Sequence, residues 1–127
     1  MEQSNIILII EDNLAHAELI KRSLEMCAIP TEVYHLTNGE DALKFFSRKF
    51  PFDDTNKYPD PHLVLLDLRI PRFSGLELLR EVKITLQKTC LPIIVLSTSS
   101  NNTDICNAYA NGANSYLVKP IDFTEFN

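Results

Sequence analysis

Several acidic, hydroxyl and basic residues stand at the ends of short apolar runs in this sequence. Glu11 and Asp12 follow the first run, Asp67 follows a later one, and Ser97 and Lys119 end two more. Three carboxylates repel one another unless a cation cancels their charge, and oxygen ligands without His or Cys favour Mg²⁺. A carboxylate beside Mg²⁺ and a lysine can act as a nucleophile toward phosphorus. The chemistry therefore depends on whether the fold gathers these side chains.

The apolar runs predict the strands that would position them. Each run is short, unbroken and rich in β-branched residues, as is typical of strands buried on both faces of a parallel sheet. The four runs cover residues 6–10, 63–66, 93–96 and 116–118. A fifth, weaker run at 32–36 mixes apolar and polar residues and predicts a strand nearer the sheet edge.

Helical patterns lie between the predicted strands. Two apolar stripes have helical spacing: Ala17, Ile20, Leu24 and Cys27, then Leu76, Leu79, Val82 and Leu86. Shorter helices are predicted at 40–47 and 102–110, and Gly112 stands where a C-terminal cap belongs. The alternation predicts βαβ units with right-handed crossovers and an α/β three-layer sandwich, forming one domain over residues 1–127. In such a sheet the carboxyl ends of the strands meet at the ligand-binding edge, which gathers the polar residues.

Composition narrows the function classes. The 127 residues suit one domain, and the formal net charge of −5 argues against direct binding to nucleic acid or to an anionic membrane surface. No apolar run approaches the length of a membrane span, so a cytoplasmic protein is expected. Cys27, Cys90 and Cys106 match no zinc or redox spacing and are expected to be reduced, mostly buried thiols.

Three features carry no prediction of chemistry. The proline-rich segment 48–61 predicts a long surface loop, mobile and tolerated by the fold, and the phenylalanines at 45–52 are expected to pack in the core and loop. His16, His35 and His62 are expected to be structural. Asp122 and Glu125 resemble a capping box, yet the chain stops one turn later, so the last helix is expected to be truncated.

In these residues the sequence resembles the receiver domain of bacterial response regulators over nearly its whole length. The matching stretches are Glu11-Asp12-Asn13, 65–71 around Asp67, 74–79 beginning Ser74-Gly75, 95–97 ending in Ser97, and 112–120 ending in Lys119-Pro120. The long loop and the Ser-Thr-Ser-Ser run are most similar to small single-domain regulators associated with phytochrome-type histidine kinases. The resemblance implies a flavodoxin-like, doubly wound, five-stranded parallel sheet in the order 2-1-3-4-5.

The resemblance also implies the roles of the acceptor and metal residues. Asp67 would accept the phosphoryl group from the phosphohistidine of a sensor histidine kinase or phosphotransfer protein. Asp12 would bind Mg²⁺ directly, Glu11 mainly through water, and the backbone carbonyl of Arg69 would complete the protein ligands. Lys119 would contact free Asp67 and then the phosphoryl group. Glu11 departs from the Asp that is commoner in the family, so the water-mediated geometry is expected to differ.

Further roles concern the switch. Ser97 would hydrogen-bond a phosphoryl oxygen, and counting back from Lys119 selects it over Thr98. Tyr116 would be the aromatic switch that swings inward as Ser97 moves, altering the surface of the fourth helix, fifth strand and fifth helix, through which a homodimer is possible. The family also has a cis peptide before the residue equivalent to Pro120.

Three other functions compete with this interpretation. A phosphatase of the haloacid-dehalogenase kind needs an acid two residues after its nucleophile, where this chain has Arg69. A nucleotide-binding fold needs a phosphate-cradling loop, and a chain with three glycines and Glu11-Asp12 after the first strand has none. The third is a receiver that works as a binding module without phosphorylation. The expected protein is therefore a phospho-acceptor switch rather than a turnover enzyme.

Overall fold

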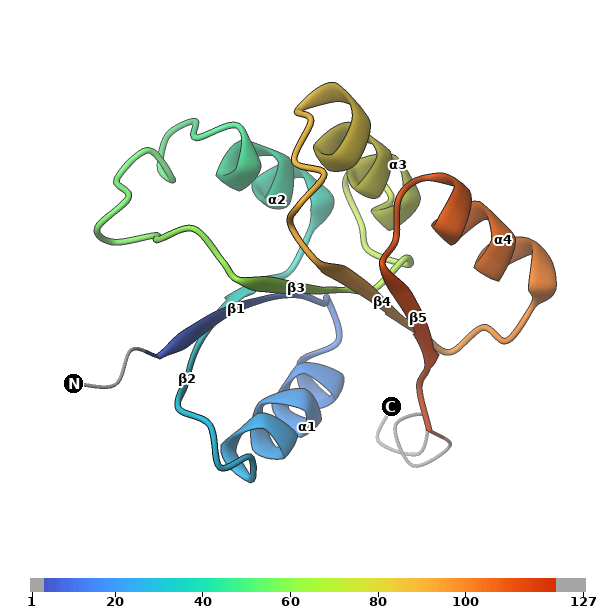
Figure 1. Ribbon diagram of the computed structural model, residues 1–127, viewed down its shortest axis with the longest axis horizontal. Helices are drawn as coiled ribbons and strands as arrows, with labels where there is room; N and C mark the ends of the chain where they lie inside the picture. The colour runs from blue at the N-terminus through green and yellow to red at the C-terminus, as the bar shows by residue number, and fades with distance from the viewer. Residues whose placement is uncertain (1–3, 121–127) are drawn as a thin grey trace.

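The computed structural model describes residues 4–120 and shows a five-stranded parallel sheet with helices on both faces. The strands are β1 (Asn5–Ile10), β2 (Thr31–Leu36), β3 (Leu63–Leu66), β4 (Ile93–Ser97) and β5 (Ser115–Val118). Their order is β2-β1-β3-β4-β5, which confirms the predicted topology and places the weak second run at an edge. Helix α1 (Leu14–Glu25) covers one face, and α2 (Gly39–Phe46), α3 (Gly75–Arg80) and α4 (Asn102–Ala110) cover the other (Figure 1).

Alternating side chains of the strands divide the core between these two faces. Leu8, Val64 and Val95 point toward α2 and α3, whereas Ile9 and Leu65 point toward α1. Leu8, Ile9 and Val64 are fully buried, as expected of central strands covered on both sides. The sequence runs are continuous because neither face of these strands meets water.

Each α-helix begins at a side-chain cap, which fixes where the preceding loop ends. The Asn13, Asn38, Ser74 and Asn101 side chains accept hydrogen bonds from backbone N–H groups in the first turns of α1, α2, α3 and α4. Gly112 has a φ of 106° just after α4, so the predicted glycine cap is confirmed. All four of these loops follow parallel strands that end at the same edge of the sheet, so the caps also fix where each helix starts at that edge.

The third helix differs from its predicted stripe. After α3 the chain continues as a π-helical turn, η1 (Glu81–Thr85), which shifts the buried side of the following residues. Before this turn, Leu78 and Leu79 are buried on the same helical face as Val82, while Leu76 lies beside that face and is partly exposed, so its predicted place in the stripe was wrong. Lys83 is drawn inside by the same turn, and its Nζ donates to Asn114 Oδ1 at 2.8 Å and to the Leu91 carbonyl.

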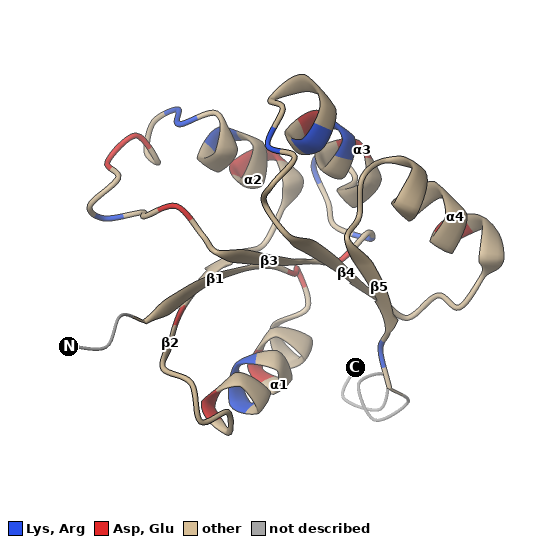
Figure 2. Ribbon diagram, in the orientation of Figure 1, with Lys and Arg blue, Asp and Glu red and all other residues tan. Residues whose placement is uncertain are grey.

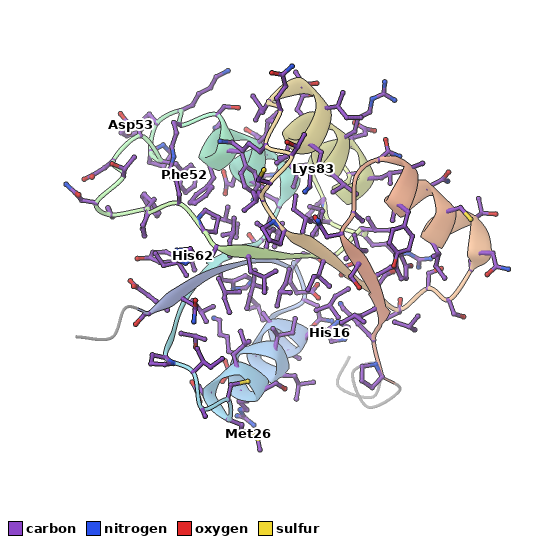
Figure 3. All side chains as sticks on the ribbon, in the orientation of Figure 1. His16, Met26, Phe52, Asp53, His62 and Lys83 are labelled. Atoms are coloured by element: carbon purple, nitrogen blue, oxygen red, sulfur yellow. The ribbon has the colours of Figure 1, made fainter. Side chains whose placement is uncertain are left out.

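The segment between α2 and β3 contains no helix or strand, as predicted, yet part of it belongs to the core. Phe52, labelled in Figure 3, is 6% exposed and packs edge-on against Phe45 and Tyr58. The expected packing role is confirmed for Phe45, Phe46 and Phe52 but was wrong for Phe50, which is 82% exposed. The Arg48 guanidinium donates to the Phe52 carbonyl at 3.2 Å, to the Tyr58 carbonyl and to Asp60. The segment is therefore pinned by one arginine and one phenylalanine, with residues 53–57 exposed between them.

Three other expectations need correction or fall outside the described residues. Cys27, Cys90 and Cys106 are exposed, because Cys27 follows the end of α1, Cys90 lies in the loop before β4, and Cys106 is on the outer side of α4. Within residues 4–120 the cis peptide bond precedes Pro51, so the expected cis bond before Pro120 was wrong. The prediction about the last helix concerns residues 121–127, which lie outside the described part. Within residues 4–120, no helix is long and apolar enough to cross a bilayer.

Candidate functional site

The carboxyl ends of β1, β3 and β5 bring together side chains that are far apart in the sequence. Glu11 and Asp12 follow β1, Asp67 follows β3, and Lys119 follows β5. Figure 2 shows the acidic segments after β1 and β3 and the basic segment after β5 at this edge. Glu11, Asp67 and Lys119 are buried, whereas Asp12 is exposed. The parallel register therefore gathers the predicted charged residues as expected.

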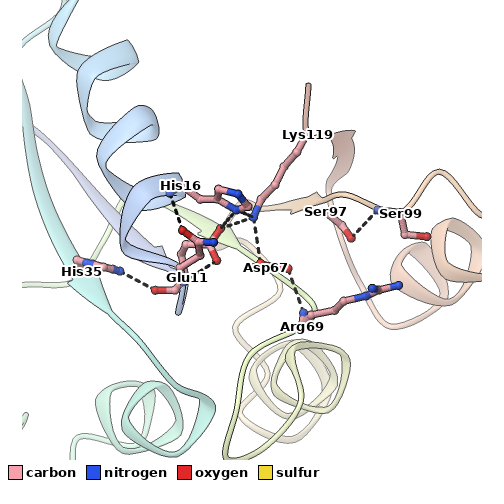
Figure 4. A network of polar contacts seen from close by, with 9 residues as sticks. Glu11, His16, His35, Asp67, Arg69, Ser97, Ser99 and Lys119 are labelled. Carbon is pink, nitrogen blue, oxygen red and sulfur yellow. Dashed lines mark hydrogen bonds and ion pairs between the residues drawn. The ribbon is translucent and has the colours of Figure 1, made fainter. Parts of the chain in front are cut away.

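Lys119 is the centre of the polar network drawn in Figure 4. Its side chain is 1% exposed, and its ammonium contacts Glu11 Oε1 and lies 3.0 Å from Asp67 Oδ2. A third contact joins Lys119 Nζ to His16 Nδ1 at 2.9 Å. Buried ammonium groups need such partners, because an unpaired charge in the interior is strongly unfavourable.

The Asp67 carboxylate is held from two sides. Oδ2 accepts the hydrogen bond from Lys119, and Oδ1 accepts one from the backbone N–H of Arg69 at 3.0 Å. The Arg69 side chain extends away from the carboxylate toward the β4–α4 loop (Figure 4). Arg69 thus reaches the site through its backbone, and its backbone carbonyl is also the group that was expected to bind a metal ion.

The loop after Asp67 is fitted closely against two glycines. An added Cβ at Gly75 would lie 2.5 Å from the Asp67 carbonyl oxygen, and one at Gly39 would lie 1.9 Å from the Phe73 carbonyl oxygen. Such distances are shorter than real Cβ contacts, so both positions require glycine. The Gly39 N–H donates to the Pro71 carbonyl at 2.9 Å, so the start of α2 supports the loop that carries Arg69.

Three carboxylates at this edge form a set that suits a hard divalent cation. One oxygen from each of Glu11, Asp12 and Asp67 lies within 4.8 Å of the others. Burial raises the pKa of Glu11 from 4.5 to about 7, with a further contribution from the neighbouring Asp67, and these effects outweigh the opposite effect of Lys119. The donors are all oxygen atoms, which matches the preference of Mg²⁺ and Mn²⁺.

The predicted hydroxyl and aromatic residues lie on the β4 and β5 side of the site. Ser97 is 1% exposed, whereas the alternative Thr98 is exposed. Ser97 Oγ accepts a hydrogen bond from the Ser99 N–H at 3.2 Å, and the Tyr116 hydroxyl donates to the Ser99 carbonyl at 2.8 Å. Both side chains therefore contact the same residue of the β4–α4 loop.

His16 is a site residue that sequence reasoning missed. The expectation of a purely structural role holds for the other two histidines, since His62 Nδ1 accepts from the Ile6 N–H and His35 Nε2 contacts the Glu11 carbonyl. His16 instead lies on the first turn of α1, is 4% exposed and contacts Lys119. The one feature of the sequence that could have indicated this role is its position three residues after the Asn13 cap. A side chain in that first turn lies close to the carboxylates that follow the first strand.

The family assignment follows from a comparison with known protein families. The family model for the response regulator receiver domain matches residues 7–127. The chain belongs to this family. Receiver domains are components of two-component signalling, so this receiver domain is a signalling protein.

Individual relatives agree with this assignment. The receiver domain is 37% identical over 124 residues to the probable methanogenesis regulatory protein FilR2 of Methanothrix harundinacea, covering 98% of this chain and 77% of FilR2. It superposes with a TM-score of 0.85 on the phosphorylated cyanobacterial phytochrome response regulator RcpA, at 32% identity over 97% of this chain and 86% of RcpA. The Mn²⁺-bound response regulator Rcp1, a protein of Synechocystis, gives a TM-score of 0.85 at 31% identity over 96% and 88%.

Proposed function

We propose that this receiver domain accepts a phosphoryl group on Asp67 from the phosphohistidine of a sensor histidine kinase or phosphotransfer protein. The observation that carries the proposal is the buried Asp67 carboxylate, which lies between the Lys119 ammonium and the Arg69 N–H. An acid placed in this way is poised to react with an electron-poor phosphorus while its own charge stays balanced. The phosphorylated state of the relative RcpA supports the proposal.

In the proposed reaction an Asp67 oxygen forms a bond to phosphorus as the P–N bond of the donor phosphohistidine breaks. The electron pair of the broken bond remains on the imidazole nitrogen of the donor. Lys119 is placed to exchange its contact with Asp67 Oδ2 for one with a phosphoryl oxygen. A compact ammonium on a flexible stem suits this movement, because it can follow the negative charge as the group arrives.

Mg²⁺ is the cofactor that the carboxylates fit. Glu11, Asp12 and Asp67 offer oxygens within 4.8 Å of one another, and the Arg69 backbone carbonyl is proposed to complete the protein ligands. When bound, a divalent cation supplies positive charge that stabilises the phosphoryl oxygens during transfer. The Mn²⁺-bound form of the relative Rcp1 supports the binding of a divalent cation.

The proposed switch runs from Ser97 to α4. Ser97 Oγ accepts from the Ser99 N–H, the Tyr116 hydroxyl donates to the Ser99 carbonyl, and the Ser99 hydroxyl donates to Asp104 in the first turn of α4 at 2.6 Å. A phosphoryl oxygen that draws the Ser97 hydroxyl toward Asp67 would remove its bond to Ser99. The loop, Tyr116 and the start of α4 would then settle into a second arrangement.

The surface proposed to change with phosphorylation, and so to be recognised by a partner protein, is the side formed by α4 and β5. Tyr109, Leu117 and Val118 are 49%, 50% and 45% exposed there, which is high for large apolar side chains. We propose that a kinase, a phosphorelay protein or a second copy of the chain binds this side, in the cytoplasm. In this role the domain is a switch without a substrate to turn over, because Arg69 stands where a phosphatase of the related chemistry needs an acid.

Incubation with acetyl phosphate and Mg²⁺, followed by intact mass measurement, tests the proposal. The wild-type protein should gain the mass of one phosphoryl group, and Asp67→Asn should gain none. Asp60→Asn, which changes an exposed carboxylate remote from the site, is the matched control and should be labelled normally. Phosphate retained on Asp67→Asn would show that the acceptor is another residue.

For the metal, Asp12→Ala should weaken Mg²⁺ binding more than Glu11→Ala. The reverse order would contradict the assignment of Asp12 as the direct ligand.

A further inference from the structure

His16 occupies a position in the site that neither the metal set nor the phosphate acceptor explains. It lies on α1, on a different element from the strand-end residues, and its side chain is 6% exposed. The Asn13 side chain accepts from the His16 N–H at 3.1 Å, so the helix cap fixes the backbone from which the ring extends. The ring reaches Lys119 Nζ through Nδ1 at 2.9 Å (Figure 4).

The donors of Lys119 show what this contact contributes. An ammonium has three N–H groups and no acceptor. Three acceptors surround Lys119 Nζ: Glu11 Oε1, Asp67 Oδ2 and His16 Nδ1. The first belongs to the proposed cation ligands, and the second is the carboxylate that gives up its contact when it is phosphorylated. The His16 contact is the one of the three that neither event replaces.

We infer that His16 is a positioning residue, whose Nδ1 accepts a hydrogen bond from Lys119 and keeps the ammonium beside Asp67 throughout phosphoryl transfer. The inference rests on the proposed function and adds to it a fixed point for the moving lysine. Nδ1 acts as the acceptor, so the ring proton is on Nε2. Without this anchor one N–H of a buried ammonium loses its partner, and the amine is free to turn away from the reacting oxygens.

Two substitutions of nearly equal size separate positioning from packing. In His16→Asn the side-chain oxygen stands close to the place of Nδ1 and can still accept from Lys119, whereas His16→Leu fills similar space without an acceptor. Leu favours a helix more than Asn does, so a defect confined to His16→Leu cannot come from a weakened α1. A slower rate in His16→Leu than in His16→Asn would therefore report the loss of the acceptor atom, because helix stability predicts the opposite order.

The test measures the phosphorylation rate at saturating acetyl phosphate and Mg²⁺. In this reaction Asp67 bonds to phosphorus while acetate leaves with the electron pair of the broken P–O bond. We expect His16→Leu to be slower than wild type by about tenfold or more, from the loss of one hydrogen bond to a charged group. His16→Asn should restore the rate to within about threefold. A wild-type rate in His16→Leu, or equal defects in both variants, would overturn the inference.

A second readout observes the hydrogen bond directly and needs no phosphorylation. The NMR signal of a buried, hydrogen-bonded lysine ammonium is protected from exchange with water, so the Lys119 signal should be visible in wild type and His16→Asn and broadened in His16→Leu. Identical Lys119 signals in all three proteins would overturn the inference. Failure of wild type to be labelled by acetyl phosphate would instead contradict the proposed function, while this signal would still report on His16.

Discussion

The raised pKa of Glu11 predicts that the affinity for the proposed Mg²⁺ depends on pH near neutrality. In the metal-free site the pKa of Glu11 is about 7, because burial and the neighbouring Asp67 favour the neutral carboxyl. A cation that uses this carboxylate must displace the proton, so protons and metal compete. The affinity should therefore rise with pH until Glu11 is ionised in the free protein.

The size of the effect follows from the fraction ionised. With a pKa of about 7, roughly a tenth of Glu11 is ionised at about pH 6 and roughly nine tenths at about pH 8. The apparent dissociation constant for Mg²⁺ should fall about tenfold between these values, and binding near pH 7 should release about half a proton. A carboxyl with an ordinary pKa would show almost no change over the same range.

Isothermal titration calorimetry in two buffers of different ionisation enthalpy measures both the affinity and the protons released. Glu11→Gln should remove most of the pH dependence. Histidines commonly titrate over the same range, so His16→Asn is the control for the neighbouring ring and should keep the tenfold change. A wild-type affinity that does not vary with pH, or a tenfold change that survives in Glu11→Gln, would refute the assignment of the linkage to Glu11.

The same shift predicts how stability varies without metal. The folded-state pKa of Glu11 lies above its ordinary value of 4.5, so its contribution to stability is present below about pH 4.5 and is lost as pH rises through about 7. Mg²⁺ should therefore raise the unfolding midpoint more at about pH 8 than at about pH 6, because it then cancels an ionised and otherwise unfavourable carboxylate.

Three further predictions concern packing and are measured by urea unfolding. Phe52→Ala should lower the free energy of unfolding by about 3 kcal/mol, since its ring is buried, whereas Phe50→Ala, at an 82% exposed position, should change it by less than about 0.5 kcal/mol. Gly39→Ala should cost more than about 2 kcal/mol, because the new methyl group meets a backbone carbonyl. Lys83→Met should cost about 2 kcal/mol by removing the donor to Asn114 Oδ1 and to the Leu91 carbonyl, whereas the same change at the half-buried Lys88 should cost little. Equal effects within either pair would contradict the assigned packing.

Sequence patterns predicted the central strands β1, β3 and β4 well because these strands are largely buried on both faces. The same expectation was wrong for β5, an edge strand in which Leu117 and Val118 are exposed. Continuous apolar runs leave little freedom in assigning β1, β3 and β4, and the polar residues that end them must meet at one edge once the strands are parallel. The proximity of Asp67, Glu11 and Lys119 could therefore be predicted from the sequence alone. Ser97 was separable from Thr98 by spacing alone, and its burial agrees with that choice.

The errors have a common origin in features that periodicity does not encode. Leu76 was placed on the stripe of the third helix, but the buried face contains Leu78 and Leu79, and the π-helical turn that follows α3 brings Lys83 inside. Cys27 was placed on the α1 stripe, but the helix ends at Glu25 and leaves it outside. His16 was set aside because it has no ligand partner nearby in sequence, whereas its partner in space is 103 residues away.

Charge balance explains why this site needs both a lysine and a metal ion. With all three carboxylates ionised, Lys119 cancels one negative charge and two remain, which a divalent cation can neutralise. Without the metal, the protein neutralises part of this excess by retaining a proton on Glu11, which is what its raised pKa expresses. The proposed phosphorylation of Asp67 would replace one negative charge by about two, so a metal-bound site would depart from neutrality by only about one charge. A proton on Glu11 and a bound Mg²⁺ are thus alternative ways to reduce the repulsion among the three carboxylates. Bound Mg²⁺ would also leave Lys119 free to turn from Glu11 toward the incoming phosphoryl group of the proposed reaction.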